Sequence, residues 1–371
     1  MLLFTPGPTP VPERVRLAMA KETIHHRTPE FEDIFAKARE NLLDLFGMPE
    51  VVMLASSGTG AMEASVVNLC FKKALTINAG KFGQRFGEIV KAHNLELVEL
   101  KYEWNQPAKV EDVLKEIEKD PQIDAFCIQI SESAGGLRHP VEEIAKAIKE
   151  KNPEIMVIAD GITAVGVEEI DTTNIDALIA GSQKAFMLPP GLAMIGLSDD
   201  AVRKIGNGRG YYFNLASEIK KQRKNTTAYT APTTLIIGLN AMFEEIEDFG
   251  GVEKLYLATK ARAKANQKAL ETLGLKLYPK VPAPSMSAVS FEKADELRKI
   301  LKSKYDVNIA GGQDHLKGKI FRINQMGLIK PYEAVWVVNA LELALEEMGI
   351  RKYQGSASEI FSKVYFKEFQ R

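Results

Sequence analysis

Lys184 has the surroundings in which a lysine can become a nucleophile. It follows the short apolar run 175–180 and stands among glycine, alanine, phenylalanine, methionine, leucine and proline in the stretch 181–191. Lysines are usually solvated surface charges, and Lys184 could be one of these. Its apolar neighbours instead favour a desolvated amine, whose pKa falls so that the amine becomes free to react. Such a lysine forms imines with carbonyl compounds.

A glycine-rich loop at 56–61 follows another apolar run, 51–55, and precedes a predicted helix at 61–71. Glycines permit a tight turn, and a helix N-terminus offers free N–H groups to an anion. Ser57 and Thr59 add hydroxyl donors, so the loop could hold a phosphate. It lacks the lysine of a P-loop and the spacing of a dinucleotide fingerprint, which disfavours ATP and NAD. The alternative is a plain glycine turn with a threonine cap.

Asp160 ends a third apolar run, 155–159. An aspartate at this place can be only a helix cap. The functional alternative is a buried carboxylate that faces a cationic ligand atom, because an unpaired buried charge is too costly. A phosphate loop, a strand-end carboxylate and a nucleophilic lysine together match pyridoxal phosphate. That cofactor has a phosphate, a ring nitrogen that must stay protonated, and an aldehyde.

The composition excludes several other classes of protein. The chain has 371 residues, 45% hydrophobic and 26% charged, which is typical of globular proteins and long enough for about two domains. With 48 basic and 49 acidic residues the net charge is −1, so no basic excess favours nucleic acid or an anionic membrane. Two cysteines and five histidines show no metal-binding spacing. The start lacks a basic region and a long apolar run, which predicts a cytoplasmic protein without a secretory signal.

Strands and helices alternate between about residues 50 and 200. Strands are predicted at 51–55, 74–78, 95–100, 124–130, 155–159 and 175–180, with helices at 61–71, 82–93, 110–119 and 141–150. This order predicts an α/β fold with a mainly parallel sheet. Further on, helices at 255–273, 295–304 and 332–348 and strands at 287–291 and 319–323 predict a smaller α+β domain. We expect an N-terminal arm at 1–16 that packs on both domains, a large domain at 17–254 and a small one at 255–371.

These segments together resemble the class V, fold-type I aminotransferases, in particular the alanine–glyoxylate / serine–pyruvate group, over nearly the whole chain. The motifs that carry the resemblance are Pro6-Gly7-Pro8, the loop 57–64, the segment 80–85, Glu132-Ser133 with Gly136 and Pro140, Asp160, the segment 181–184 and the strand 319–323. The resemblance implies a large pyridoxal-phosphate-binding domain with a mainly parallel seven-stranded sheet flanked by helices, followed by a smaller α+β domain.

The resemblance also implies roles for individual residues. Lys184 would form the Schiff base with the cofactor and move a proton, and Asp160 would keep the ring nitrogen protonated. Arg322 would bind the substrate α-carboxylate bidentately, which lysine does poorly; alternatively it pairs with a structural carboxylate. The remaining contacts expected with the cofactor are Ser57, Gly58 and Thr59 at the phosphate, Phe82 and Ile162 on the two ring faces, Ser133 near the ring oxygen, and Gln183 as a neighbouring polar contact.

The segment 226–232 resembles the one that reaches the cofactor phosphate of a neighbouring subunit in this family. Tyr229 and Thr230 are therefore expected cofactor contacts, and the resemblance implies a homodimer with a shared active site. The expected partners of the protein are small-molecule amino acids and 2-oxo acids. The last residues, 355–371, predict an amphipathic helix without an assigned role.

The expected reaction moves an amino group between serine, alanine or glycine and glyoxylate or pyruvate, in ping-pong order. A phosphoserine aminotransferase is the alternative, because Arg27 in the segment 24–31 resembles a residue that grips the substrate phosphate there. A cysteine desulfurase would need a cysteine on a mobile loop, whereas Cys70 and Cys127 fall in a predicted helix and a predicted strand. A non-catalytic subunit is the last alternative, and the presence of all three of Lys184, Asp160 and Arg322 argues against it.

Overall fold

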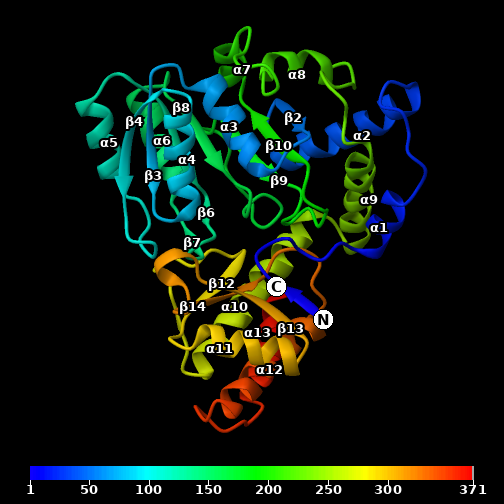
Figure 1. Ribbon diagram of the computed structural model, residues 1–371, viewed down its shortest axis with the longest axis vertical. Helices are drawn as coiled ribbons and strands as arrows, with labels where there is room; N and C mark the ends of the chain where they lie inside the picture. The colour runs from blue at the N-terminus through cyan, green and yellow to red at the C-terminus, as the bar shows by residue number, and fades with distance from the viewer. Residues whose placement is uncertain (370–371) are drawn as a thin grey trace.

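A seven-stranded sheet forms the centre of the larger part of the protein, in a computed structural model that describes residues 1–369 (Figure 1). Its order is β2 (Glu50–Leu54), β10 (Ala193–Leu197), β9 (Ala177–Gly181), β8 (Met156–Asp160), β5 (Ile123–Gln129), β3 (Lys73–Asn78) and β4 (Glu96–Lys101). Only β10 runs antiparallel to its neighbours within this sheet. The predicted α/β fold with a mainly parallel seven-stranded sheet is confirmed.

Two layers of helices cover the sheet, because side chains on a strand alternate between its faces. Val51 and Met53 point into one apolar core and Val52 and Leu54 into the other. The first core is closed by α2 (Pro29–Phe46), α5 (Val110–Lys119), α6 (Val141–Lys151) and α9 (Thr233–Phe249). The second is closed by α3 (Gly58–Leu69), α4 (Lys81–Ala92), α7 (Asp199–Ile205) and α8 (Leu215–Gln222).

Several elements of the large part were missing from the sequence prediction, among them α2, α7, α8, α9 and β10. The helix α2 has clear end signals: Thr28 Oγ1 accepts from Phe31 N–H (3.4 Å), Pro29 occupies the first turn, and Gly47 ends the helix at a left-handed φ of 59°. The strand β10 is five buried residues directly after Gly191-Leu192. Gly196 in the interior of this run weakens its strand pattern.

A second, five-stranded sheet forms the smaller part of the protein. Its order is β1 (Leu2–Phe4), β13 (Val307–Gly311), β14 (Ile320–Asn324), β12 (Met286–Ser290) and β11 (Lys276–Leu277). The helices α10 (Val252–Thr272), α11 (Ala294–Lys304), α12 (Pro331–Glu347) and α13 (Ser356–Phe369) pack with it around a separate apolar core. The expected helix in the last segment is α13, and residues 370–371 of that segment lie outside the described residues. The strand β13 had not been predicted.

The N-terminal residues extend from one part to the other (Figure 1). The strand β1 pairs in parallel with β13, and α1 (Glu13–Met19) packs against α9. The helix α10 also spans both parts, since Leu255 belongs to the large core and Ala261 to the small one. We propose the domain boundaries 1–16, 17–254 and 255–371 on this basis. The remaining elements are the hairpin of β6 (Ser131–Glu132) with β7 (Leu137–Arg138) and a short 3-10 helix, η1 (Asp314–Leu316).

Within residues 1–369 no helix combines the length and apolar character that crossing a bilayer requires.

Arg262 is a fully buried cation that joins α10 to the turn after β14. It is 1% exposed and donates to three backbone carbonyls, those of Gln325 (2.7 Å), Gly327 (2.9 Å) and Ile329 (3.3 Å). Burial lowers its pKa to about 10. A buried charge is tolerated only when its donors are all engaged, so these carbonyls and this guanidinium depend on one another.

Arg262→Met should destabilise the protein by roughly 2–4 kcal/mol, because it leaves several buried carbonyls without donors. Urea unfolding measures the change, and the exposed Lys260→Met on the same helix is the matched control. Equal stabilities of the two variants would contradict this role for Arg262.

Candidate active site

The carboxyl ends of the parallel strands bring the predicted site residues together. Lys184 follows β9, Asp160 ends β8, and the loop 56–58 leads from β2 into α3. Ligands bind at this end of open parallel sheets. Nine of the predicted residues line one pocket there: Ser57, Gly58, Thr59, Phe82, Ser133, Asp160, Ile162, Gln183 and Lys184. Three lining residues had no predicted role: Arg85, Ser131 and Thr163.

The N-terminal arm lies directly against Lys184. Lys184 Nζ donates to the carbonyl of Pro6 (2.5 Å), and Thr9 Oγ1 donates to the carbonyl of Lys184 (2.6 Å). Gly7 adopts a φ of 114°, and a Cβ added there would come within 2.4 Å of Lys184 Nζ. A side chain at position 7 would therefore collide with the amine, so the arm helps to exclude water from it.

The Lys184 amine is poised to lose its proton near neutral pH. Burial, together with the charges of Arg322 and Arg85, lowers its pKa to about 8, although Asp160 acts in the opposite direction. A lysine in ordinary solution titrates near 10.4. The desolvation expected from its apolar neighbours is thus present, and a larger fraction of the amine is uncharged and nucleophilic at neutral pH.

Asp160 is buried at the end of β8. Its Oδ1 accepts from Ile162 N–H (2.9 Å), the local bond expected of a cap, whereas Oδ2 accepts no hydrogen bond from residues 1–369. Burial raises the pKa of this carboxyl to about 6, while the nearby cations Arg85 and Lys184 lower it. Asp160 therefore has both a capping contact and a carboxylate oxygen that is available to a cationic group.

The phosphate-type loop has the geometry of an anion site. Ser57 is the N-cap of α3, and its side chain accepts no capping bond. The backbone N–H groups of Gly58 and Thr59 have no partner within the described part of the chain, as the first turn of a helix leaves them. A Cβ at position 58 would lie 2.3 Å from Ile162 Cδ1, so only glycine lets this loop approach Ile162.

Phe82 and Arg85 form a stacked pair one turn apart on α4. The Arg85 guanidinium carbon lies 4.7 Å from the Phe82 ring centroid, and Arg85 Nη1 donates to Thr59 Oγ1 (2.9 Å). Their spacing of three residues places both on one face of the helix. That spacing is the sequence signal by which Arg85 could have been found.

Arg322 on β14 lies beside the pocket and outside its lining. Its Nη1 donates to the carbonyl of Ser133 (2.6 Å), and Nε and Nη2 donate to the carbonyl of Gly311 (3.0 and 2.7 Å). Within residues 1–369 no carboxylate lies within 4.0 Å of its guanidinium. Burial lowers its pKa to about 10, although the charge of the buried Glu132 acts to raise it.

Two buried polar atoms of the pocket lack hydrogen-bond partners among the described residues. They are Gln183 Oε1 and Ser131 Oγ. Buried polar groups are nearly always hydrogen-bonded, so these atoms suit a polar ligand that enters the pocket. No group of three or more histidine, cysteine, aspartate or glutamate side chains in the same residues could hold a metal ion.

Tyr229, Thr230 and Arg27 lie outside this pocket. Tyr229 donates through its hydroxyl to the carbonyl of Tyr211 (2.7 Å) and stacks on Tyr212, with ring centroids 5.1 Å apart. Thr230 lines a separate hollow beside the end of β2. Arg27 is exposed and donates to Thr226 Oγ1 (3.3 Å). The structure thus groups Arg27 with Thr226 and Thr227, outside the lining of the pocket that contains Lys184.

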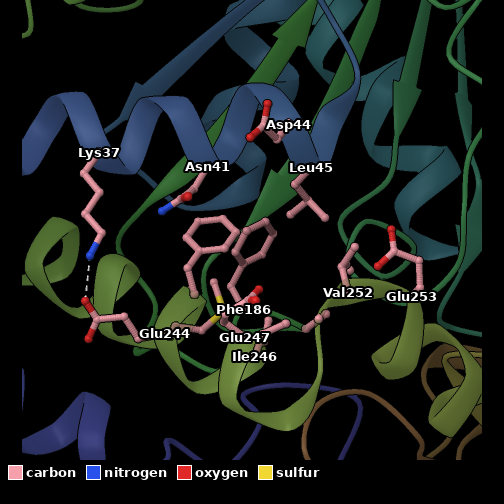
Figure 2. A pocket seen from close by; sticks show the side chains of 15 residues that line it. Lys37, Asn41, Asp44, Leu45, Phe186, Glu244, Ile246, Glu247, Val252 and Glu253 are labelled. Atoms are coloured by element: carbon pink, nitrogen blue, oxygen red, sulfur yellow. Dashed lines mark hydrogen bonds and ion pairs between the residues drawn. The ribbon is translucent and has the colours of Figure 1, made fainter.

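A second hollow, of about 570 Å³, opens between α2 and α9. Figure 2 shows Phe186 pointing into it and Lys37 paired with Glu244 (2.7 Å) at one side. Ala185 and Phe186, which follow Lys184, line its inner wall, but Lys184 itself faces the other pocket. Phenylalanine, methionine, leucine and isoleucine side chains contribute to its lining, and we assign it no reaction.

Neither cysteine is suited to act as a nucleophile. Cys70 follows the end of α3 and Cys127 lies within β5, and both are buried. Burial raises the pKa of the Cys70 thiol to about 12 and that of Cys127 well above its usual value. Because the thiolate is the reactive form, these positions disfavour cysteine-dependent chemistry.

This chain is similar to aminotransferases both in sequence and in structure. The sequence matches the family described as "Aminotransferase class-V" over residues 1–339. An uncharacterized aminotransferase of Helicobacter pylori is 53% identical over 99% of this chain and 100% of its own. A serine–glyoxylate aminotransferase of Methylorubrum extorquens is 27% identical over 95% of this chain and 93% of its own. The crystal structure of a subgroup IV aspartate aminotransferase from Thermus thermophilus has a TM-score of 0.87 and 33% identity, and covers 94% of this chain and 99% of that one.

Lys184 should react with amine reagents at a lower pH than the other lysines. In the free protein, labelling by trinitrobenzenesulfonate, followed by peptide mass spectrometry, should have its midpoint at about pH 8 for Lys184, against about 10.4 for exposed lysines. Arg322→Gln should raise this midpoint and Asp160→Asn should lower it, since each removes one of the charges that act on the amine. A midpoint for Lys184 equal to that of surface lysines would show that the amine is solvated.

Proposed function

The chain belongs to the class V aminotransferase family, and from that premise we propose that it is a pyridoxal-phosphate-dependent transaminase. It moves an amino group between a small amino acid (serine, alanine or glycine) and a 2-oxo acid, glyoxylate or pyruvate, in ping-pong order. The observation that carries the proposal is the convergence of Lys184, Asp160 and the 57–59 loop on one pocket. Pyridoxal phosphate, when bound, supplies an aldehyde that bonds an amine and a ring that accepts electrons.

The residues of the pocket fit the parts of this cofactor. The unpartnered N–H groups at the start of α3 suit its phosphate, and Oδ2 of Asp160 is available to the protonated ring nitrogen. Phe82 and Ile162 offer apolar faces to the ring. Lys184 has a pKa of about 8 and can hold or release a proton near neutral pH, so it is the group that moves protons in this site.

Arg322 is the residue that we assign to the substrate α-carboxylate. Its guanidinium is held by the carbonyls of Ser133 and Gly311, which fix its plane without neutralising its charge. Planar bidentate recognition of a carboxylate is the task for which arginine is best suited. Its position beside the pocket would orient the amino acid toward Lys184.

We propose in addition that two copies form a homodimer with shared active sites, in the cytoplasm. The stacked tyrosines at 211, 212 and 229 support this, because Tyr211 is 83% exposed although it is aromatic. Tyr229 and Thr230 lie away from the pocket of their own chain, as expected for residues that serve the partner's cofactor phosphate.

The amino donor distinguishes three versions of the proposal. The name of the Methylorubrum relative favours serine with glyoxylate. The name of the Thermus structure, at 33% identity, favours aspartate as a second candidate. Phosphoserine depends on Arg27, which donates to Thr226 Oγ1 and does not line the pocket that contains Lys184.

Lys184→Ala should abolish transamination, since the variant lacks the amine that bonds the cofactor and moves the proton. The assay is a panel of serine, alanine, glycine, aspartate and phosphoserine against glyoxylate, pyruvate and 2-oxoglutarate. Lys254→Ala, at the exposed start of α10, is the control and should keep wild-type rates. Persistent turnover by Lys184→Ala, or no turnover of any pair by the wild type, would contradict the proposed function.

Two substitutions test which arginine binds which part of the substrate. Arg322→Lys tests binding of the α-carboxylate, and Arg27→Ala tests binding of a substrate phosphate. Arg322→Lys should raise the KM for every amino acid by about tenfold or more, because lysine cannot make the bidentate contact. Arg27→Ala should leave the KM for serine and alanine within about twofold. A selective loss of phosphoserine turnover in Arg27→Ala would instead establish the alternative substrate, and an unchanged KM in Arg322→Lys would place the carboxylate elsewhere.

A further inference from the structure

A fully buried carboxylate lies next to the pocket and has no part in the proposed reaction. Glu132 on β6 is 0% exposed and does not line the pocket. Its Oε2 accepts from the backbone N–H groups of Phe82 (3.0 Å) and Gly83 (2.9 Å), and its Oε1 accepts from that of Ala134 (2.9 Å). One side chain thus connects α4 to the turn that follows β6.

Glu132 supplies the cap that α4 lacks in its own sequence. The N-cap residue is Gly80, which has no side chain to accept a bond, and Phe82 and Gly83 carry N–H groups that the first turn leaves unpaired. A carboxylate is favoured at this positive end of the helix. A Cβ at position 80 would lie 2.3 Å from Glu132 Cδ, so the close approach of the carboxylate requires glycine there.

Each end of this connection carries a group that faces the cofactor or the substrate in the proposed site. On α4 the connection holds the backbone of Phe82, the residue assigned to one face of the ring. On the other side it holds Ala134, next to Ser133, whose carbonyl accepts from Arg322 Nη1 (2.6 Å). The ring-stacking residue and the carboxylate-binding arginine are therefore coupled through one buried glutamate.

We propose that Glu132 is a positioning residue that fixes Phe82 and the Ser133–Arg322 pair relative to one another, and so sets cofactor affinity and amino-acid affinity together. The inference rests on the proposed function. It gives Glu132 no contact with the reacting atoms, so its loss should affect binding more than the chemical step.

Glutamine at position 132 tests this with little change in volume. A carboxylate has two acceptor oxygens, whereas an amide has one oxygen and an NH2 group that only donates. In Glu132→Gln, either Ala134 N–H or the Phe82 and Gly83 pair must face the amide nitrogen. A buried N–H without an acceptor is costly enough that we expect one end of the connection to move.

Glu342→Gln is the matched control. Glu342 is also 0% exposed, and it accepts from Ala357 N–H (3.0 Å), Gln354 N–H (3.1 Å) and Ser356 Oγ (3.0 Å) at the start of α13, in the small domain. It matches Glu132 in burial and in accepting from backbone N–H groups, and it differs by an ion pair with Arg351 (3.7 Å). Among the described residues no hydrogen bond or ion pair joins it to Phe82, Ser133 or Arg322. Loss of stability alone is therefore the expected result of this substitution.

The experiment measures three quantities for wild type, Glu132→Gln and Glu342→Gln: urea stability, the Kd of the cofactor-free protein for pyridoxal phosphate by spectrophotometric titration, and the KM for the amino donor. Glu132→Gln should raise both the Kd and the KM by about five- to a hundredfold, with a smaller change in kcat. Glu342→Gln should leave both within about twofold.

Gly80→Ala provides a second test, because the added Cβ would displace the Glu132 carboxylate while Glu132 itself remains. This variant should raise the Kd for pyridoxal phosphate and the KM for the amino donor in parallel. It covers the case in which Glu132→Gln fails to fold. Wild-type Kd and KM in the folded variants would overturn the proposal and leave Glu132 a purely structural residue. A wild-type protein that does not bind pyridoxal phosphate would instead contradict the proposed function, so the two failures are distinguishable.

Discussion

The desolvation of one amine is the constraint on which the rest of the site depends. Lys184 is enclosed by the N-terminal arm, where the carbonyl of Pro6 accepts a hydrogen bond from its Nζ and Gly7 leaves room for that atom. Burial and the charge of Arg322 disfavour the charged amine while Asp160 favours it, and the resulting pKa is about 8. An amine with this pKa can be a nucleophile and also carry a proton at neutral pH, which is what a transaminase requires of its lysine.

The fold explains how residues that are far apart in sequence reach this amine. Parallel strands place Asp160, the 57–59 loop and Lys184 at one edge of the large sheet. The small domain contributes Arg322 from β14, and β1 ties the arm to that same small sheet. The arm that covers Lys184 and the strand that carries Arg322 thus belong to one sheet, which links the covering of the amine to the position of the arginine that we propose for the substrate carboxylate.

Much of this arrangement could be predicted from the sequence, because long buried strands and amphipathic helices have clear patterns. The helix α5 has the predicted bounds, and most other predicted elements differ by one to three residues. The strands β10 and β13 were missed although β2 and β8, which are as short, were predicted; each of the missed strands contains a glycine, Gly196 or Gly311, which weakens the strand pattern. Arg85 and Glu132 had no predicted roles since their importance comes from contacts across the fold, with Phe82 and with the backbone at 82–83 and 134. The placement of Tyr229, Thr230 and Arg27 outside the lining of the pocket that contains Lys184 is likewise a property of the folded chain.

The most direct test of the central claim is to find which residue bonds the cofactor. The protein is incubated with pyridoxal phosphate, reduced with borohydride, digested, and mapped by mass spectrometry. The account predicts one phosphopyridoxyl group, on the peptide that contains Lys184, and its loss when an amino donor is added before reduction. A label spread over surface lysines, or fixed on a different lysine, would contradict it.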